Sequence, residues 1–170
     1  MAGDVETGLV VPVPELEGFV SPFLAAAGNP AHITLLYPFV SPPVADAVID
    51  RLAEIFSGWP SFDFRMVDVG WFGEDVVYLK PSPAGRFKAL ISRLSAEWPD
   101  YPPYGGVHGD PTPHLTLADG EDPASMRKLA DRVAARLPVV CSATEVWLMQ
   151  GSRQPASWTR IRRFGLSGVG

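Results

Sequence analysis

Residues 32–35 read His-Ile-Thr-Leu, and the phrase returns at residues 114–117 as His-Leu-Thr-Leu. A proline precedes each copy, Pro30 in the first case and Pro113 in the second. Side chains of a β-strand alternate between its two faces, so the histidine and the threonine of one copy point the same way. Two such strands lying side by side would place two imidazoles and two hydroxyls around one point.

This set of side chains suits proton transfer at a phosphate ester. One imidazole can take a proton while the other gives one, because the ordinary pKa of histidine lies near neutrality. The two hydroxyls can donate hydrogen bonds to oxygens on which negative charge develops. A lone histidine is more often structural, but two of the three histidines hold the same place in a repeated phrase. We therefore predict that His32, Thr34, His114 and Thr116 are catalytic.

Taken together, the two phrases resemble the signature of the two-histidine (2H) phosphoesterase superfamily, which includes 2′-5′ RNA ligase-like proteins and cyclic phosphodiesterases. Each motif of that family reads His, any residue, Thr or Ser, and then an apolar residue, and both copies fit it. The resemblance implies an α+β fold with two pseudo-symmetric lobes, each an antiparallel sheet with outer helices, around a central cleft. It implies one such domain over residues 1–170, with one motif on each lobe.

The order of the predicted elements indicates a duplicated plan. Each half of the chain reads as strand, helix, motif strand, helix, strand. The helical pattern before the first motif is interrupted or restarted by Pro22, and Gly58 is placed to end the helix after that motif. We expect strands near residues 8–13, 32–37, 62–66, 75–80, 114–118, 139–150 and 158–166, and the later helices after residues 42–43, near residues 87–94 and from Pro123.

The net charge of the chain is −5, with 19 acidic residues against 14 lysines and arginines. Affinity for long RNA or DNA depends on clustered basic residues, so no long nucleic acid is expected as a partner. A small nucleotide or an RNA end, held by a few charges, fits this balance better. Four arginines do gather late in the sequence, at positions 153, 160, 162 and 163.

Composition indicates an ordinary globular protein, with 46% apolar residues and no apolar run long enough to cross a membrane. The first seven residues are polar and acidic, so no secretory signal is expected. The single cysteine, Cys141, excludes an internal disulfide and is expected to be a small buried apolar residue. We expect a monomer in the reducing cytoplasm, without a membrane partner.

Four further residues, Phe39, Tyr104, His108 and Arg153, are predicted to contact the substrate. Tyr104 and His108 lie in the proline- and glycine-rich loop before the second motif, and such loops often form the wall of a site. Tyr104, like Tyr101, could stack on a base or pack the loop onto the body of the protein. Phe39 could rim the cleft or pack in the core. Arg153 could meet a phosphate or stay solvated.

Two aromatic residues near these positions, Tyr37 and Trp158, are not included among the predicted substrate contacts. Strand alternation places Leu36 on the side of His32 and Thr34, and Tyr37 on the opposite, core side. Tyr37 is therefore predicted to be structural. Trp158 follows the polar loop of residues 151–157, and both a binding role and a packing role stay open for it.

No metal or cofactor is expected. The two motif histidines lack the ordered cluster of Cys, Asp or Glu partners that is typical of zinc sites. Asp110 and Asp119 flank the second motif, but acidic residues in loops are usually solvated. The sequence contains neither a glycine-rich phosphate loop nor a G-x-S-x-G elbow.

We expect a metal-independent phosphodiesterase, acting in RNA processing, that hydrolyses 2′,3′-cyclic phosphate or 2′-5′ phosphodiester bonds of nucleotides or RNA ends. Reversible 2′-5′ ligation of RNA ends is the same chemistry run backward. One alternative is a nucleotide-binding or sensing module with little turnover, which the four intact motif positions disfavour. The other is a phosphodiesterase for cyclic oligonucleotide signals, which would share the site and differ in the surrounding loops.

Overall fold

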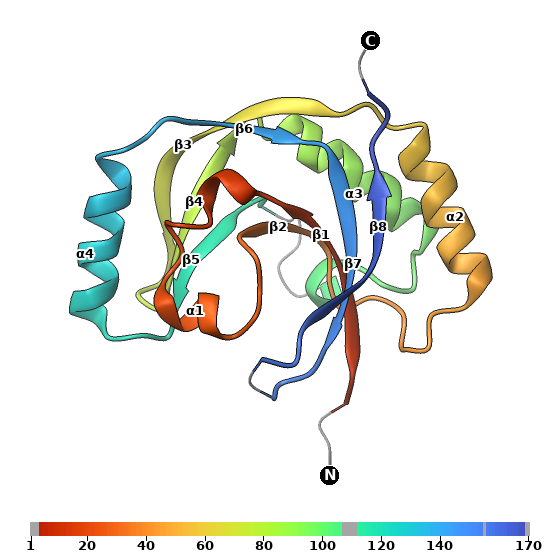
Figure 1. The fold of residues 1–170 in the computed structure, drawn as a ribbon, viewed down its shortest axis with the longest axis horizontal. Helices are drawn as coiled ribbons and strands as arrows, with labels where there is room; N and C mark the ends of the chain where they lie inside the picture. The colour runs from red at the N-terminus through yellow and green to blue at the C-terminus, as the bar shows by residue number, and fades with distance from the viewer. Residues whose placement is uncertain (1–3, 107–111, 155, 169–170) are drawn as a thin grey trace.

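The computed structural model describes residues 4–106, 112–154 and 156–168 (Figure 1). Within these ranges eight strands form one sheet in the order β6-β3-β4-β5-β2-β1-β7-β8, and all neighbours are antiparallel. The strands are β1 (Glu6–Pro12), β2 (His32–Leu36), β3 (Phe62–Phe72), β4 (Val76–Ser82), β5 (Leu115–Asp119), β6 (Val139–Ala143), β7 (Glu145–Gly151) and β8 (Thr159–Gly165).

Local capping residues mark some of the helix ends. Asp122 accepts a hydrogen bond from the Ser125 N–H at 2.9 Å directly before a proline, which has no N–H to satisfy, and α4 starts there. Gly58 ends α2, as predicted. The helices are α1 (Pro22–Ala26), α2 (Asp46–Ser57), α3 (Gly85–Glu97) and α4 (Pro123–Ala134), with 3₁₀ turns η1 (Pro14–Leu16) and η2 (Pro103–Gly106).

The predicted restart of the first helical segment at Pro22 is confirmed. The turn η1 ends at Leu16, and α1 begins only at Pro22. Ser21 caps α1, because its Oγ accepts a hydrogen bond from the Leu24 N–H at 3.2 Å. The backbone N–H of Ser21 donates to the carbonyl of Leu117 at 2.8 Å, which ties this segment to β5.

The sheet consists of two lobes that meet between β2 and β5, and the predicted α+β fold is confirmed. One lobe contains β2, β1, β7 and β8, against which α3 and α2 pack; the other contains β5, β4, β3 and β6, with α4 and α1. In Figure 1, α4 and α2 lie at opposite sides of the curled sheet. The two halves of the chain do not correspond to the two lobes, because β3 joins the second lobe and β7 and β8 return to the first.

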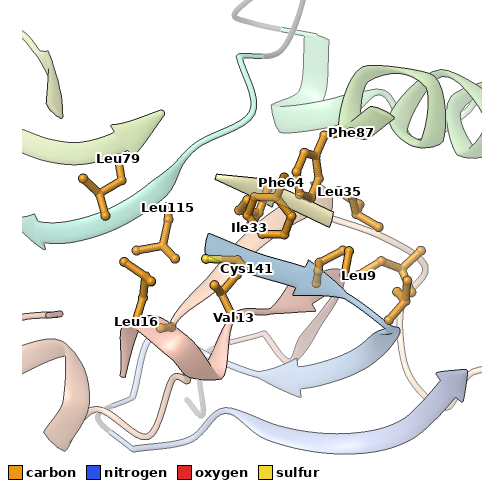
Figure 2. Close-up of a cluster of buried hydrophobic side chains, with 14 of the residues drawn as sticks. Leu9, Val13, Leu16, Ile33, Leu35, Phe64, Leu79, Phe87, Leu115 and Cys141 are labelled. Carbon is orange, nitrogen blue, oxygen red and sulfur yellow. The ribbon is translucent and has the colours of Figure 1, made fainter. Parts of the chain in front are cut away.

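Apolar side chains from both lobes form one core cluster, part of which is shown in Figure 2. Ile33 and Leu115, the second residues of the two motifs, lie in it and are completely buried. Cys141 is also buried there, as predicted, and burial raises the pKa of its thiol to about 12. The motif strands are therefore fixed to the core by their apolar positions, which leaves their His and Thr positions for the opposite face.

Among the described residues, no helix combines the length and the apolar character needed to cross a membrane.

Candidate active site

The two motifs meet at the centre of the sheet. Ile33 of β2 pairs with Leu115 of β5 in antiparallel register. Extending this register by one residue on either side places His32 opposite Thr116 and Thr34 opposite His114. Directly opposed residues of an antiparallel pair share a face, with Cβ atoms about 4.5–5.5 Å apart. The structure thus brings the four predicted catalytic residues together, each histidine beside the threonine of the other motif.

Both imidazoles are oriented in the same way. His32 Nδ1 lies 2.6 Å from the carbonyl oxygen of Pro30, and His114 Nδ1 lies 2.7 Å from that of Thr112. A carbonyl oxygen only accepts, so each Nδ1 carries the hydrogen and donates it. In a neutral ring this leaves the lone pair on Nε2, which is therefore the nitrogen that can exchange a proton with a substrate.

Both histidines favour the neutral form more than a histidine in water does. Burial is the main cause, and it lowers the pKa of His32 and of His114 below the ordinary value of 6.5. The hydrogen bonds to Pro30 and Thr112 act in the opposite direction and only partly offset it. The positive charge that His114 would carry lowers the pKa of His32 further, so the two rings influence each other's protonation.

Three aromatic residues surround His114. The Phe72 and Tyr78 rings meet it edge-on, with centroids 5.0 and 5.4 Å away, and the Tyr104 ring is stacked at 6.5 Å. Tyr78 pairs with Thr116 across β4 and β5. The Tyr78 ring fits because Gly70 on β3 has no side chain, since a Cβ there would lie 2.5 Å from the ring. These ring contacts fix the position of His114, the histidine of the second motif.

Tyr104, a predicted substrate-binding residue, contacts both motifs. Its hydroxyl is hydrogen-bonded to the hydroxyl of Thr34, and its ring lies against His114. Its backbone N–H donates to the carbonyl of Tyr37 at 2.6 Å. Its φ is +52°, a left-handed conformation that is uncommon for a bulky residue. This backbone geometry, together with the Tyr37 contact, places the phenol between the first and second motifs.

A cavity of about 330 Å³ opens beside the first motif. His32 and Thr34 line it together with the side chains of Asn29, Tyr37 and Asp119. Gly8, Val10, Pro30, Met149 and Trp158 form the rest of its wall. Its volume is within the range of small-ligand sites.

Tyr37 was predicted to lie on the core side, and this prediction is wrong. The pairing of β1 with β2 passes from Val10–Thr34 to Leu9–Leu36, so β2 contains one extra residue at this point. Such a bulge reverses the alternation beyond it. Leu36 is therefore completely buried, while Tyr37 is half-buried and lines the cavity.

The Tyr37 phenol, which lines this cavity, has two charged neighbours, Glu6 and Arg153. Burial, followed by a hydrogen bond with the Glu6 side chain, raises the pKa of Tyr37 to about 12. Arg153 is exposed on the β7–β8 loop and lies close enough for its charge to act on this phenol. Trp158 meets the Tyr37 ring edge-on at 5.8 Å. The predicted Arg153 is thus near the cavity without being part of its wall.

Two other predicted substrate contacts remain, Phe39 and His108. Phe39 is 4% exposed and packs against Trp98 and Tyr101 at 5.2 and 5.8 Å, so it lies in the core and not in the wall of the cavity. The aromatic neighbours turn it into the core, and Tyr101 takes the packing role. His108 lies outside the described residues.

Sequence reasoning missed Tyr78, Phe72 and Met149, and it assigned Asp119 to solvent. Gly70 could have indicated Tyr78, because an isolated glycine inside a strand often marks a close approach of another group. Within the described part of the chain, no three His, Cys, Asp or Glu side chains are grouped so that they could hold a metal ion.

An antiparallel sheet that pairs two H-x-T motifs across its centre defines a 2H phosphoesterase fold. The model of the 2′-5′ RNA ligase superfamily matches residues 21–155, and the chain belongs to this superfamily. No curated protein matches the sequence.

Solved structures show the same fold. E. coli LigT complexed with 3′-AMP is 19% identical with a TM-score of 0.61, and the alignment covers 96% of this chain and 98% of that one. TT0787 of Thermus thermophilus is 20% identical with a TM-score of 0.60, and the alignment covers 97% of this chain and 100% of that one. E. coli LigT complexed with NADP+ is 20% identical with a TM-score of 0.58, and the alignment covers 98% and 99%.

Proposed function

We propose that this protein is a metal-independent phosphodiesterase that hydrolyses 2′,3′-cyclic phosphate or 2′-5′ phosphodiester bonds of nucleotides or RNA ends. The observation that carries the proposal is the cross-strand arrangement of His32, Thr34, His114 and Thr116 about the Ile33–Leu115 pair. A structural neighbour, E. coli LigT, has been solved with 3′-AMP, a nucleotide that carries its phosphate on the 3′ oxygen of the ribose.

The two histidines supply both proton transfers that hydrolysis needs. For a 2′,3′-cyclic phosphate, a water oxygen forms a bond to phosphorus and loses its proton to the neutral Nε2 of one histidine. The bond from phosphorus to one ribose oxygen breaks, and that oxygen takes a proton from the Nε2–H of the other histidine. An in-line displacement requires the two imidazoles to lie on opposite sides of the phosphate, and the antiparallel pairing of the two motifs supports this placement.

The threonine hydroxyls supply hydrogen bonds to the phosphate oxygens that do not leave. Negative charge concentrates on these oxygens in the transition state, and donors already in place stabilise it. Thr34 can serve in this way while it is bonded to Tyr104, because a hydroxyl has one hydrogen to donate and can also accept. In the free protein burial raises the pKa of the Tyr104 phenol and this bond lowers it in part, as it does when Thr34 is the donor. Binding of the substrate would turn the Thr34 hydrogen to a phosphate oxygen and leave the Tyr104 hydroxyl to donate to Thr34.

The substrate itself supplies the charge that the acid needs. Both imidazole pKa values are lowered in the free protein, so both rings tend to be neutral at pH 7. An anionic phosphate between them favours the protonated form of a neighbouring imidazole. Binding of the substrate therefore favours the state with one neutral and one protonated histidine, which is the state that catalyses the reaction.

The test is turnover of a panel in the presence of EDTA: 2′,3′-cyclic mononucleotides, 2′-5′ dinucleotides and cyclic dinucleotides. The proposal expects hydrolysis of a member of the first two groups. Activity that EDTA abolishes and one divalent ion restores would contradict metal independence. Turnover confined to cyclic dinucleotides would favour the signalling alternative, and tight binding without turnover would favour a sensing module.

A further inference from the structure

We propose that the open face of the sheet between β2 and β8 binds a second nucleotide unit, so that the substrate is a dinucleotide or a longer RNA end. This inference rests on the proposed function, because it places the scissile phosphate at the two motifs. The nucleoside that carries this phosphate occupies the cavity beside His32. The phosphate on its 5′ side then reaches Arg160.

The strand register makes this face continuous. Thr34 of β2 pairs with Val10 of β1, and Val10 pairs with Trp147 of β7. Two residues further along β7, Met149 pairs with Arg160 of β8. Paired residues share a face, so these side chains lie on the same side of the sheet as the motif threonine. Neighbouring strands are about 4.8 Å apart, which puts β8 about 14 Å from β2 along the sheet.

A second cavity, of about 580 Å³, adjoins the first along this face. The two cavities share residues 29–30, Met149 and Trp158 as wall residues. Trp147 and Arg160 line the second cavity. A ligand that starts between the motif histidines can therefore continue past Trp158 without leaving the protein surface.

Trp158 lines both cavities and is held in place by its neighbours. A Cβ on Gly151 would lie 2.4 Å from the Trp158 ring, so the ring packs directly on glycine backbone. The Tyr37 ring also meets the indole edge-on, with the ring centroids 5.8 Å apart. Trp158 is half-buried, and its exposed part offers an aromatic surface at the point where the two units of a dinucleotide would be joined.

The second cavity contains an ordered cationic and aromatic pair. The Arg160 guanidinium lies 4.8 Å from the centroid of the Trp147 ring. The Trp147 Nε1–H donates to Glu145 Oε1 at 2.7 Å, and the other oxygen of that carboxylate is paired with Arg163 at 2.7 Å. Glu145 thus fixes the indole plane and neutralises Arg163. Arg160 belongs to none of the ion pairs found within the described ranges, so its charge is available to a phosphate.

One carboxylate also lines the second cavity. Glu17 accepts a hydrogen bond from the Ala31 N–H at 3.0 Å, and it therefore supports the loop that leads into the first motif. Arg160 and the two tryptophans reach the same cavity from β7, from β8 and from the residue just before β8. The sugar and base can meet the aromatic wall while the phosphate meets Arg160, which is the combination that single-stranded nucleic acid sites use.

The inference is tested by comparing 2′,3′-cyclic AMP with the dinucleotide ApA that ends in a 2′,3′-cyclic phosphate. A hydrogen bond to a charged group is worth a factor of about ten or more, so kcat/KM for the dinucleotide should exceed that for the mononucleotide by at least about tenfold. Arg160→Ala should bring this ratio towards one. Equal kcat/KM for the two substrates, or an unchanged ratio in Arg160→Ala, would overturn the inference.

Arg162→Ala is the matched control. Arg162 is an exposed arginine on the same strand, but the register shift near Met149 pairs it with the completely buried Leu148. Its side chain therefore belongs to the other face of the sheet, and the substrate ratio should stay as in the unmodified protein. An equal fall of the ratio in Arg162→Ala and Arg160→Ala would show a general effect of charge and contradict a specific subsite.

Failure of the proposed function can be told apart from failure of this inference. If neither substrate is hydrolysed, the proposed function is wrong, and binding decides the inference. Calorimetry would then compare ApA carrying a 3′-phosphate with 3′-AMP. Tighter binding of the dinucleotide that Arg160→Ala removes would support the subsite. Equal affinities would refute it.

Discussion

Ile33 pairs with Leu115 between β2 and β5, and each residue lies between the histidine and the threonine of its own motif. Both side chains are completely buried. The core therefore fixes the midpoint of the site, and the four polar side chains are arranged around it on the opposite face. A relationship of this kind makes the two motifs parts of one site.

Loss of either motif histidine should remove most of the activity. General acid–base catalysis contributes about 10²–10⁴-fold, so His32→Ala and His114→Ala should each lower kcat by an amount in that range. The double variant should be little worse than the single ones, because the two groups act as a unit. Thermal unfolding and circular dichroism should show that the variants are folded. A folded single variant with nearly full kcat would exclude the two-histidine mechanism.

Removal of the Tyr104 hydroxyl should weaken catalysis through Thr34. A hydrogen bond contributes about 0.5–1.5 kcal/mol, so Tyr104→Phe should lower kcat by about 2- to 10-fold, with KM changed less. Thr34→Val removes an oxyanion donor and should cost up to about 10²–10³-fold. In a double-mutant cycle, Tyr104→Phe should have almost no further effect once Thr34 is Val. Fully additive losses would show that Tyr104 does not act through this hydroxyl.

The dependence of activity on pH should be bell-shaped and displaced towards acid. The acidic limb of kcat/KM reports the base of the free enzyme and the basic limb reports its acid. Burial lowers the pKa of His32 and of His114 below 6.5, so the maximum of kcat/KM should lie below pH 6.5. The bound phosphate anion raises both pKa values, and the kcat profile should therefore be shifted towards higher pH. A maximum of kcat/KM above pH 7 would contradict this electrostatic account.

Gly151→Ala should damage the cavity beside His32 by displacing Trp158. The new Cβ would lie 2.4 Å from the indole ring and 2.8 Å from the Trp158 Cα, so both must move. Overpacking of this kind costs about 1–3 kcal/mol, and KM should rise with the loss of the wall. Gly165→Ala is the matched control, because it also lies in a strand and a Cβ there meets nothing within 4 Å. Urea unfolding and steady-state kinetics of the two variants would measure the difference.

Binding of substrate should depend only weakly on salt. The chain has a net charge of −5, and few arginines lie near the cavities. We expect a slope of about one to three units in a plot of log K against log salt, since each phosphate contact contributes about 0.7–0.9. Arg153→Ala should weaken binding more than Arg136→Ala, whose guanidinium lies over the Phe19 ring. Tight and steeply salt-dependent binding of a long RNA would overturn this expectation.

The sequence predicted the motif strands and the main helices because their signals are local. The apolar positions of residues 114–117 repeat those of residues 32–35, and prolines or glycines mark several helix ends. The pairing order of the sheet is not local. The return of β7 and β8 to the first lobe depends on contacts between residues more than a hundred positions apart, which no periodicity reveals.

Side-chain roles near the motifs were harder to predict. The error at Tyr37 arises from one extra residue in β2, which reverses the alternation although β2 itself contains no glycine or proline that would mark the irregularity. Phe39 packs in the core against Trp98, a residue 59 positions further along the chain. The environment of Phe39 therefore could not be predicted from its neighbours in the sequence. Tertiary contacts decide the side-chain environment in both cases.

The division of the strands between the lobes also makes the two lobes unequal in what they need for assembly. The strands β3, β4, β5 and β6 are consecutive in the sequence, with helices between them, so the second lobe consists of one continuous segment. The first lobe joins β1 and β2 to β7 and β8, so the edge of β1 that meets β7 stays open until these two C-terminal strands pair with it. An open edge of this kind invites pairing with other chains. A chain that lacks β7 and β8 would therefore keep the second motif on a complete lobe and leave the first motif on an incomplete one.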